Sequence, residues 1–223
     1  MAPMKLSEHL SKRDAIIRAG SELFLSHGYD GASMEVIAEE AGVSRQTIYN
    51  QFESKEALFR AIIDCLVDEF MAPLAKASRG TNVRETLFAF AKHTLGLLVR
   101  PKFVGLYRLA LTETNRFPDF GPTIYEAGAL RAQKTVAEYL REQVQSGTLE
   151  LADPFAAAGQ FIALTVRDTE LKALFGVESR LSTHEIQGRA KAGVDFFLKV
   201  YGRSELTLSH KIPKTNRRSV RQA

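Results

Sequence analysis

The sequence contains no tryptophan and a single cysteine, Cys65, among its 223 residues. One cysteine excludes an internal disulfide and suits a reducing compartment. Its neighbours are mostly apolar, namely Ile62, Ile63, Leu66 and Val67. We therefore expect Cys65 to be a buried, unreactive thiol rather than a redox sensor.

Long apolar runs are also missing. The most apolar stretch, residues 155–166, contains Gln160 and Thr165 and is too short to span a bilayer. The opening residues MAPMKLSEHLSKRDA carry no apolar segment of the kind that a secretory signal needs. We expect a cytoplasmic protein that does not enter a membrane.

The common catalytic and metal-binding patterns are absent as well. The sequence has no HExxH pair, no phosphate-binding glycine loop and no GxSxG motif. The five histidines are not spaced as metal ligands: His9, His27, His93, His184 and His210. We expect neither an enzyme, nor a metal site, nor a cofactor.

The net charge of +4 is unevenly distributed. Residues 1–60 carry 7 Lys and Arg against 9 Asp and Glu, whereas residues 203–223 carry 6 against 1. The basic character therefore belongs to the C-terminal tail, which we expect to be disordered, solvated and at most a non-specific contact for polyanions. Net charge does not reveal whether a local basic surface exists elsewhere in the chain.

Residues 33–52, SMEVIAEEAGVSRQTIYNQF, predict two short helices joined by a glycine turn. Ser33 and Ser44 are N-cap residues, and Gly42 permits the left-handed conformation that ends the first helix. We expect an apolar side in each helix, formed by Val36, Ile37 and Ala41 and by Ile48 and Phe52. Such a pair is a helix-turn-helix.

The opposite side of the second helix carries Arg45, Gln46, Tyr49 and Asn50 at spacings of three and four. These side chains could form a merely solvated face. Tyr49 favours a binding surface, because a face built only for water rarely needs an aromatic ring.

The motif resembles the DNA-binding domain of the TetR family of one-component repressors. The matching landmarks extend over about fifty positions: Gly28-Tyr29, Ser33-Met34, Ile37-Ala38, residues 41–44, Ile48-Tyr49, Phe52, and residues 54–56 before Leu58. The resemblance implies a homodimeric repressor that leaves its pseudo-palindromic, double-stranded DNA operator when a small molecule binds the C-terminal part.

Residue chemistry suggests how such a surface would contact DNA. We expect Arg45 and Gln46 to contact base edges in the major groove. We expect phosphate contacts from Thr47, Tyr49 and Lys55, and from backbone N–H groups at Ser33, and leave Asn50 unassigned.

The remaining chain predicts helices and no strands, giving an all-α fold of about nine helices. We place a helix-turn-helix domain at residues 10–70, a helical effector-binding and dimerisation domain at 71–202, and the tail at 203–223. Residues 106–200 also resemble the AefR-like C-terminal subgroup of TetR regulators.

Residues 154–176 and 182–202 form the last two predicted helices, and each has one apolar side. The first side comprises Phe155, Ala158, Gly159, Ile162 and Val166, and the second Ile186, Ala190, Gly193, Val194, Phe197 and Tyr201. These residues are either intramolecular core or, as the resemblance implies, the dimer interface.

We expect a ligand cavity between residues 82 and 145, suited to a flat hydrophobic or aromatic effector. Its candidate lining is Phe90, His93, Tyr107, Leu111 and Tyr125, each of which could instead be ordinary core. Two other functions stay open: a DNA-binding protein without an effector, and a helical enzyme or binding protein.

Overall fold

The computed structural model describes residues 11–77 and 81–203, so the predictions for the leader and most of the basic tail lie outside the described residues. These residues form an all-α fold. An isolated β-bridge joins Leu149 and Gly202. The α-helices are α1 (Lys12–Gly31), α2 (Met34–Glu40), α3 (Arg45–Gln51), α4 (Lys55–Ala75), α5 (Val83–Leu98), α6 (Pro101–Glu113), α7 (Phe120–Tyr125), α8 (Arg131–Gln145), α9 (Pro154–Leu174) and α10 (Thr183–Tyr201).

Local hydrogen bonds set most helix boundaries. The side chains of Ser11, Ser33, Ser44 and Ser54 each accept a backbone N–H in the first turn of α1, α2, α3 and α4. Gly42 has the predicted left-handed conformation, with φ 65°. Ser182 and Glu185 form both bonds of a capping box at the start of α10.

The helical segment that follows α6 is not one uniform α-helix. It starts at Phe120 as α7, continues through a π-helical turn (η1, Glu126–Leu130) and becomes α8. Pro122 does not break the chain, because it lies in the first turn of α7, where a missing backbone N–H removes no helical hydrogen bond.

Two hydrophobic cores are built around α4. One contains the apolar residues of α1–α3 together with the first half of α4 and residues of α6 and α7, including Leu106 and Phe120. The other contains the second half of α4 with α5, α8, α9 and α10. The first core therefore extends beyond residue 70, and α4 belongs to both cores.

An aromatic cluster fills the first core where α6 and α7 meet the N-terminal helices. The rings of Phe24 and Tyr29 stack with centroids 5.5 Å apart. Phe120 lies 5.2 Å from both Tyr29 and Phe59, measured between ring centroids. Such pairs add about 0.5–1.5 kcal/mol each beyond their buried area.

Two predictions of burial are wrong. Val36 is 42% exposed, because α2 buries the side that carries Met34, Ile37 and Ala38 and turns position 36 outward. Cys65 is exposed, because it lies on the solvent side of α4 with Asp68 and Glu69.

The small-and-large pattern of the last two helices is mainly intramolecular core. Ala158, Val166, Ala190, Val194 and Phe197 are buried within the chain. A Cβ at Gly193 would overlap the side chain of Thr165, so the glycine permits the close approach of α10 to α9. Phe155 of the predicted set is 40% exposed, and other large apolar residues of α9 and α10 are exposed as well: Leu164, Leu171, Phe196 and Val200.

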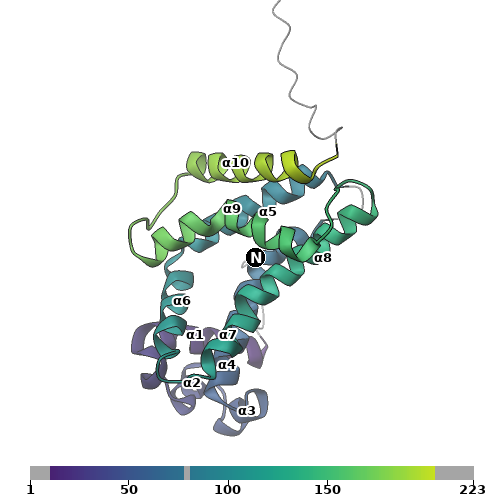
Figure 1. Ribbon diagram of the computed structural model, residues 1–223. Coiled ribbons are helices and arrows are strands. Elements are labelled where there is room, and N and C mark those ends of the chain that lie inside the picture. The colour runs from purple at the N-terminus through teal and green to yellow at the C-terminus, as the bar shows by residue number, and fades with distance from the viewer. Residues whose placement is uncertain (1–10, 78–80, 204–223) are drawn as a thin grey trace, which may run out of the picture.

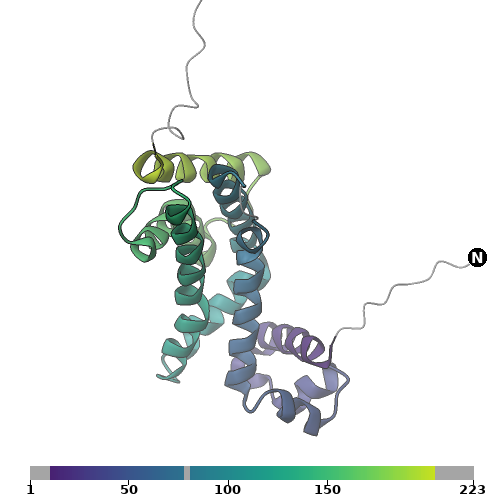
Figure 2. The same ribbon diagram turned by 90° about the vertical axis from the view of Figure 1, so that its right-hand side faces the viewer.

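The arrangement separates two ends of the molecule. Helices α9 and α10 lie at one end and α3 at the other (Figure 1). Figure 2 shows α4 running from the helix-turn-helix end towards the C-terminal helices.

Candidate nucleic-acid interface and ligand cavity

Helix α3 is fixed on one side and open on the other. Ile48 is completely buried against the N-terminal core, and Phe52 is buried just beyond the helix. Arg45, Gln46 and Asn50 are exposed on the other side, as the sequence predicts. Tyr49 is also exposed, so the aromatic ring is available for contact with a partner.

Glu35 of α2 organises part of this exposed side. Its carboxylate forms an ion pair with Arg45, and it accepts a hydrogen bond of 3.2 Å from the Tyr49 hydroxyl. Bonding to its own backbone N–H at the helix start, followed by Tyr49 and Arg45, lowers the pKa of Glu35 below its ordinary value. The sequence analysis missed Glu35, because its contact with Arg45 depends on how α2 and α3 pack.

The other polar side chains of α3 are also bonded locally. The Gln46 amide donates to Asn50 Oδ1 at 2.8 Å. The Thr47 hydroxyl lies 2.9 Å from the Ser44 hydroxyl, and the half-buried Thr47 thus belongs to the N-cap. Both of these hydrogen bonds are exposed to solvent.

Lys55 and Ser33 lie at helix starts and have structural partners. The ammonium group of Lys55 donates to the Tyr29 carbonyl at 2.7 Å and lies 4.5 Å from the centre of the Tyr29 ring. The Ser33 hydroxyl accepts the Val36 N–H at 3.2 Å. Of the other basic residues nearby, Lys12 is exposed and Arg13 lies 5.1 Å above the Phe52 ring.

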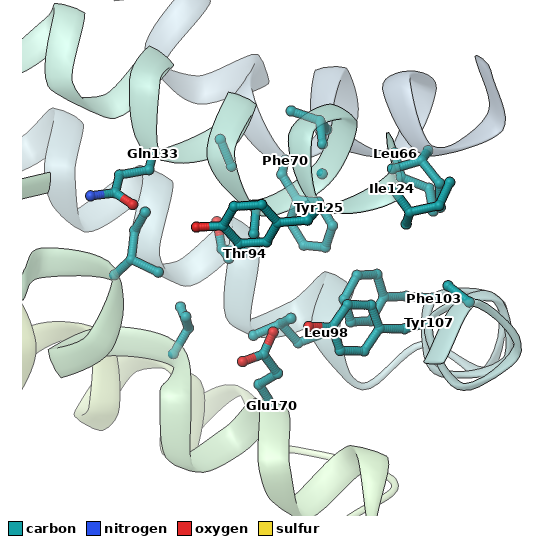
Figure 3. A pocket seen from close by; sticks show the side chains of 18 of the residues that line it. Leu66, Phe70, Thr94, Leu98, Phe103, Tyr107, Ile124, Tyr125, Gln133 and Glu170 are labelled. Atoms are coloured by element: carbon teal, nitrogen blue, oxygen red, sulfur yellow. The ribbon is translucent and has the colours of Figure 1, made fainter. Parts of the chain in front are cut away.

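A cavity of about 470 Å³ lies between the helices of the C-terminal part. This volume falls within the range of ligand pockets, about 300–1,000 Å³. The lining is mostly apolar and comes from α4, α5, α6, α7, η1, α8 and α9: Ile63, Leu66, Val67, Phe70, Met71, Phe90, Thr94, Leu98, Phe103, Tyr107, Ala110, Leu111, Thr114, Gly121, Ile124, Tyr125, Gly128, Ala129, Ala132, Gln133, Gly159, Ile162, Ala163, Val166, Arg167 and Glu170. Figure 3 shows part of this lining.

The structure brings four of the five predicted lining residues to the cavity: Phe90, Tyr107, Leu111 and Tyr125. The placement of His93 is corrected, since it is not part of the lining and its Nε2 lies 2.7 Å from the Glu69 carbonyl oxygen. A helical turn of α5 directs Phe90 and Thr94 inward, whereas the adjacent position 93 faces α4.

The polar part of the lining was missed by the sequence analysis. Thr94, Gln133, Arg167 and Glu170 face the cavity from α5, α8 and α9. Burial raises the pKa of Tyr107 and also that of Glu170. No motif marks these residues, because they come together only when α9 packs across α6 and α8.

Other kinds of site find no support in the part of the chain that the structure describes. No three His, Cys, Asp or Glu side chains gather there as metal ligands. None of the helices described is long and apolar enough to cross a bilayer.

Comparison with known proteins matches both halves of this arrangement. Residues 16–62 match the family described as bacterial regulatory proteins of the tetR family. Residues 85–203 match the C-terminal domain of AefR-like transcriptional repressors. The HTH-type transcriptional repressor ComR of Escherichia coli K12 is 40% identical over 60 residues, which is 27% of this chain and 29% of ComR.

Two solved structures extend the similarity over most of the chain. A protein of Mesorhizobium loti assigned to the TetR family is 30% identical, with a TM-score of 0.71, over 86% of this chain and 96% of its own. The Flavonoid-responsive Regulator FrrA is 34% identical, with a TM-score of 0.70, over 86% of this chain and 98% of its own. With both parts of the fold matched, the chain belongs to the TetR family of DNA-binding transcriptional regulators.

Proposed function

We propose that the protein is a ligand-responsive repressor, which binds a pseudo-palindromic operator as a homodimer and leaves it when a hydrophobic or aromatic effector binds. One observation carries the proposal: α4 lines the cavity and also holds the DNA-binding core. Ile63 and Phe70 face the cavity, and Leu58 and Phe59 of the same helix are buried in the N-terminal core. As a bacterial regulator of transcription, it would act in the cytoplasm.

The dimer surface in this proposal is the exposed apolar side of α9 and α10. It comprises Leu164, Leu171, Phe196 and Val200, the large side chains that the intramolecular packing leaves open. Phe196 and Val200 are one turn apart on α10, the helix that lies at the end of the molecule opposite α3 (Figure 1). An isologous contact here would leave both α3 helices free for DNA.

The DNA contacts follow the exposed side of α3. Arg45 and Gln46 would contact base edges, with Thr47, Tyr49 and Lys55 on phosphates and Ser33 at a helix N-terminus. Arg45 must leave Glu35 for guanine, and Gln46 must leave Asn50 for adenine. Because each of these bonds is solvent-exposed, the exchange costs little.

The effector class follows from the lining. Aromatic rings surround the cavity, with Phe103 stacked on Tyr107 at 5.5 Å and packed edge-on against Phe70 at 5.1 Å, both measured between centroids. FrrA is described as flavonoid-responsive, and this chain resembles it over nearly its full length. A flat aromatic compound such as a flavonoid therefore agrees both with the aromatic lining of the cavity and with the resemblance to FrrA.

Two helices connect the cavity to the DNA-binding part. Besides α4, α6 lines the cavity with Tyr107 and packs on α1, where Gly105 admits the Leu25 side chain. The Arg108 guanidinium also donates to the Leu174 carbonyl at the end of α9, at 2.8 Å. A ligand that moves α6 against α9 would thus displace α1, and with it the spacing of the two α3 helices.

Thermodynamic linkage gives the test. An inducer that weakens operator binding must itself bind less tightly to the operator complex, by the same factor, typically 5- to about 150-fold. Calorimetric titration of apigenin, a flavone, with and without operator DNA measures this factor. Equal affinities in the two titrations would contradict the proposed switch.

A further inference from the structure

The cavity contains a buried hydroxyl without a partner. Thr94 is only 6% exposed, and its Oγ1 makes no hydrogen bond to any described residue. Buried hydroxyls nearly always have a partner, and an orphan at a cavity wall identifies a place where a ligand can supply one. Figure 3 shows Thr94 among the side chains that surround the space.

A second polar group faces the same space from α9. The Glu170 side chain is 18% exposed, and its recorded partner is Arg167 at 3.4 Å. This distance is long for a charge-assisted bond, which is usually about 2.7–2.9 Å. A carboxylate can accept several hydrogen bonds, so Glu170 retains free acceptor capacity towards the cavity. The Tyr107 hydroxyl points into the same region (Figure 3) and feels the charge of Glu170.

Two other polar groups of the lining are already bonded. The Thr114 hydroxyl donates to the Leu111 carbonyl at 2.7 Å, and the Gln133 amide donates to the Phe155 carbonyl at 2.9 Å. Tyr125 is largely exposed and belongs to the margin of the cavity. Thr94 on α5 and Glu170 on α9 therefore retain hydrogen-bonding capacity for a polar ligand atom.

From this geometry, and resting on the proposed function, we propose that Glu170 accepts a hydrogen bond from a phenolic hydroxyl of a neutral aromatic effector, whose second polar atom bonds the Thr94 hydroxyl. Glu170 and Thr94 are thus specificity-determining residues. A phenol is a strong donor, and its ring suits the aromatic walls provided by Phe70, Phe103 and Tyr107.

Charge decides against other ligand classes. A ligand carboxylate placed at Glu170 would meet a like charge in a partly desolvated site. An ammonium group would meet the positive charge of Arg167, which already accompanies Glu170. A neutral donor disturbs neither member of that pair.

Calorimetry on the full-length protein can test the assignment, because the absence of tryptophan precludes a tryptophan fluorescence assay. The probes are apigenin, its fully O-methylated derivative and dodecanoic acid. We expect wild-type protein to bind apigenin about tenfold or more tightly than the methyl ether. We expect the weakest binding from dodecanoic acid, with Glu170→Gln improving it.

Substitutions separate the two contacts. Glu170→Gln, which keeps an acceptor but removes the charge, should weaken apigenin binding about 3- to 10-fold, and Glu170→Met about 10- to 100-fold. Neither should weaken binding of the methyl ether. Thr94→Val should weaken apigenin binding about fivefold, while Thr94→Ser retains it. Thr86→Val is the matched control, because Thr86 is buried on the same helix but does not line the cavity.

The outcomes also distinguish this inference from the proposed function. If Glu170→Met binds apigenin as wild type does, or if the methyl ether or dodecanoic acid binds as tightly as apigenin, the assignment is refuted. Failure of wild-type protein to bind apigenin refutes it too. Operator release is measured separately by fluorescence anisotropy. Apigenin that binds through Glu170 without releasing DNA would support the assignment and contradict the switch.

Discussion

The proposed dimer interface makes a quantitative prediction for Phe196. This side chain is 56% exposed in the single chain, although it is large and apolar. Phe196→Ala removes the exposed ring and leaves the neighbouring intramolecular core, including Phe197, in place. We expect the monomer to remain folded and its self-association to weaken.

The size of the effect follows from the area that dimerisation would cover. Complete burial of a phenylalanine side chain contributes about 1.5–3 kcal/mol. About half of this remains available in the single chain, or about 0.8–1.5 kcal/mol per protomer. Because twofold symmetry counts the residue twice, Phe196→Ala should cost about 1.5–3 kcal/mol, which weakens the dimer about 10- to 150-fold.

Sedimentation equilibrium measures the dissociation constant directly, and circular dichroism checks that each variant is folded. Val200→Ala and Val36→Ala form a matched pair, since both valines are exposed on helices, but Val36 lies on α2. We expect Val200→Ala to weaken the dimer less than Phe196→Ala does, and Val36→Ala to leave it unchanged. An unchanged dissociation constant for Phe196→Ala would refute the interface.

The other predictions concern DNA binding and pH. Arg45→Ala should cost roughly 1–3 kcal/mol of operator affinity and relax base preference at one position of each half-site. If a binding-site selection shows that the variant prefers the same bases as the wild type, Arg45 is not a base contact. Glu35→Gln removes the partner of Arg45 and should tighten operator binding. Glu39→Gln is its control, because it removes the same charge from an exposed position on the same helix and should tighten binding less. Equal effects of the two substitutions, measured by fluorescence anisotropy, would mean that only net charge matters. Lys55→Gln removes one cation from each protomer and should lower the slope of log affinity against log salt concentration by about two for the dimer. A loss of stability with an unchanged slope would mean that Lys55 only holds the Tyr29 contact. Burial raises the folded-state pKa of Glu170 above its ordinary value of 4.5. The contribution of Glu170 to the free energy of unfolding is therefore greatest below pH 4.5 and declines as pH rises through the folded-state pKa. Glu170→Gln should remove this decline from the pH profile of Tm, and a variant with the wild-type profile would contradict the argument.

Sequence patterns predicted the features that local chemistry controls. The serine N-caps of α2 and α3 and the left-handed Gly42 each depend on residues within a few positions of one another. The apolar periodicity likewise predicted the buried positions Ile48 and Phe52. These features suffice to predict the helix-turn-helix and the all-α class.

Features that depend on tertiary packing could not be predicted in this way. Periodicity indicates that a helix has an apolar side, but not which neighbour covers it, so the apolar side of α10 is compatible with intramolecular core and with the dimer interface that the family resemblance implies. The same uncertainty explains the errors at Val36, Cys65 and His93. Glu35 and Glu170 escaped notice because a lone glutamate on a helix carries no pattern.

The membership of α4 in both cores has a consequence for folding. An isolated fragment of residues 10–70 would expose the surfaces of Tyr29 and Phe59 that Phe120 covers in the complete chain. It would also lose Leu106 and Ala110 from its core. Neither core can therefore unfold without stripping apolar contacts from the other, and calorimetry should record one cooperative transition for the whole chain.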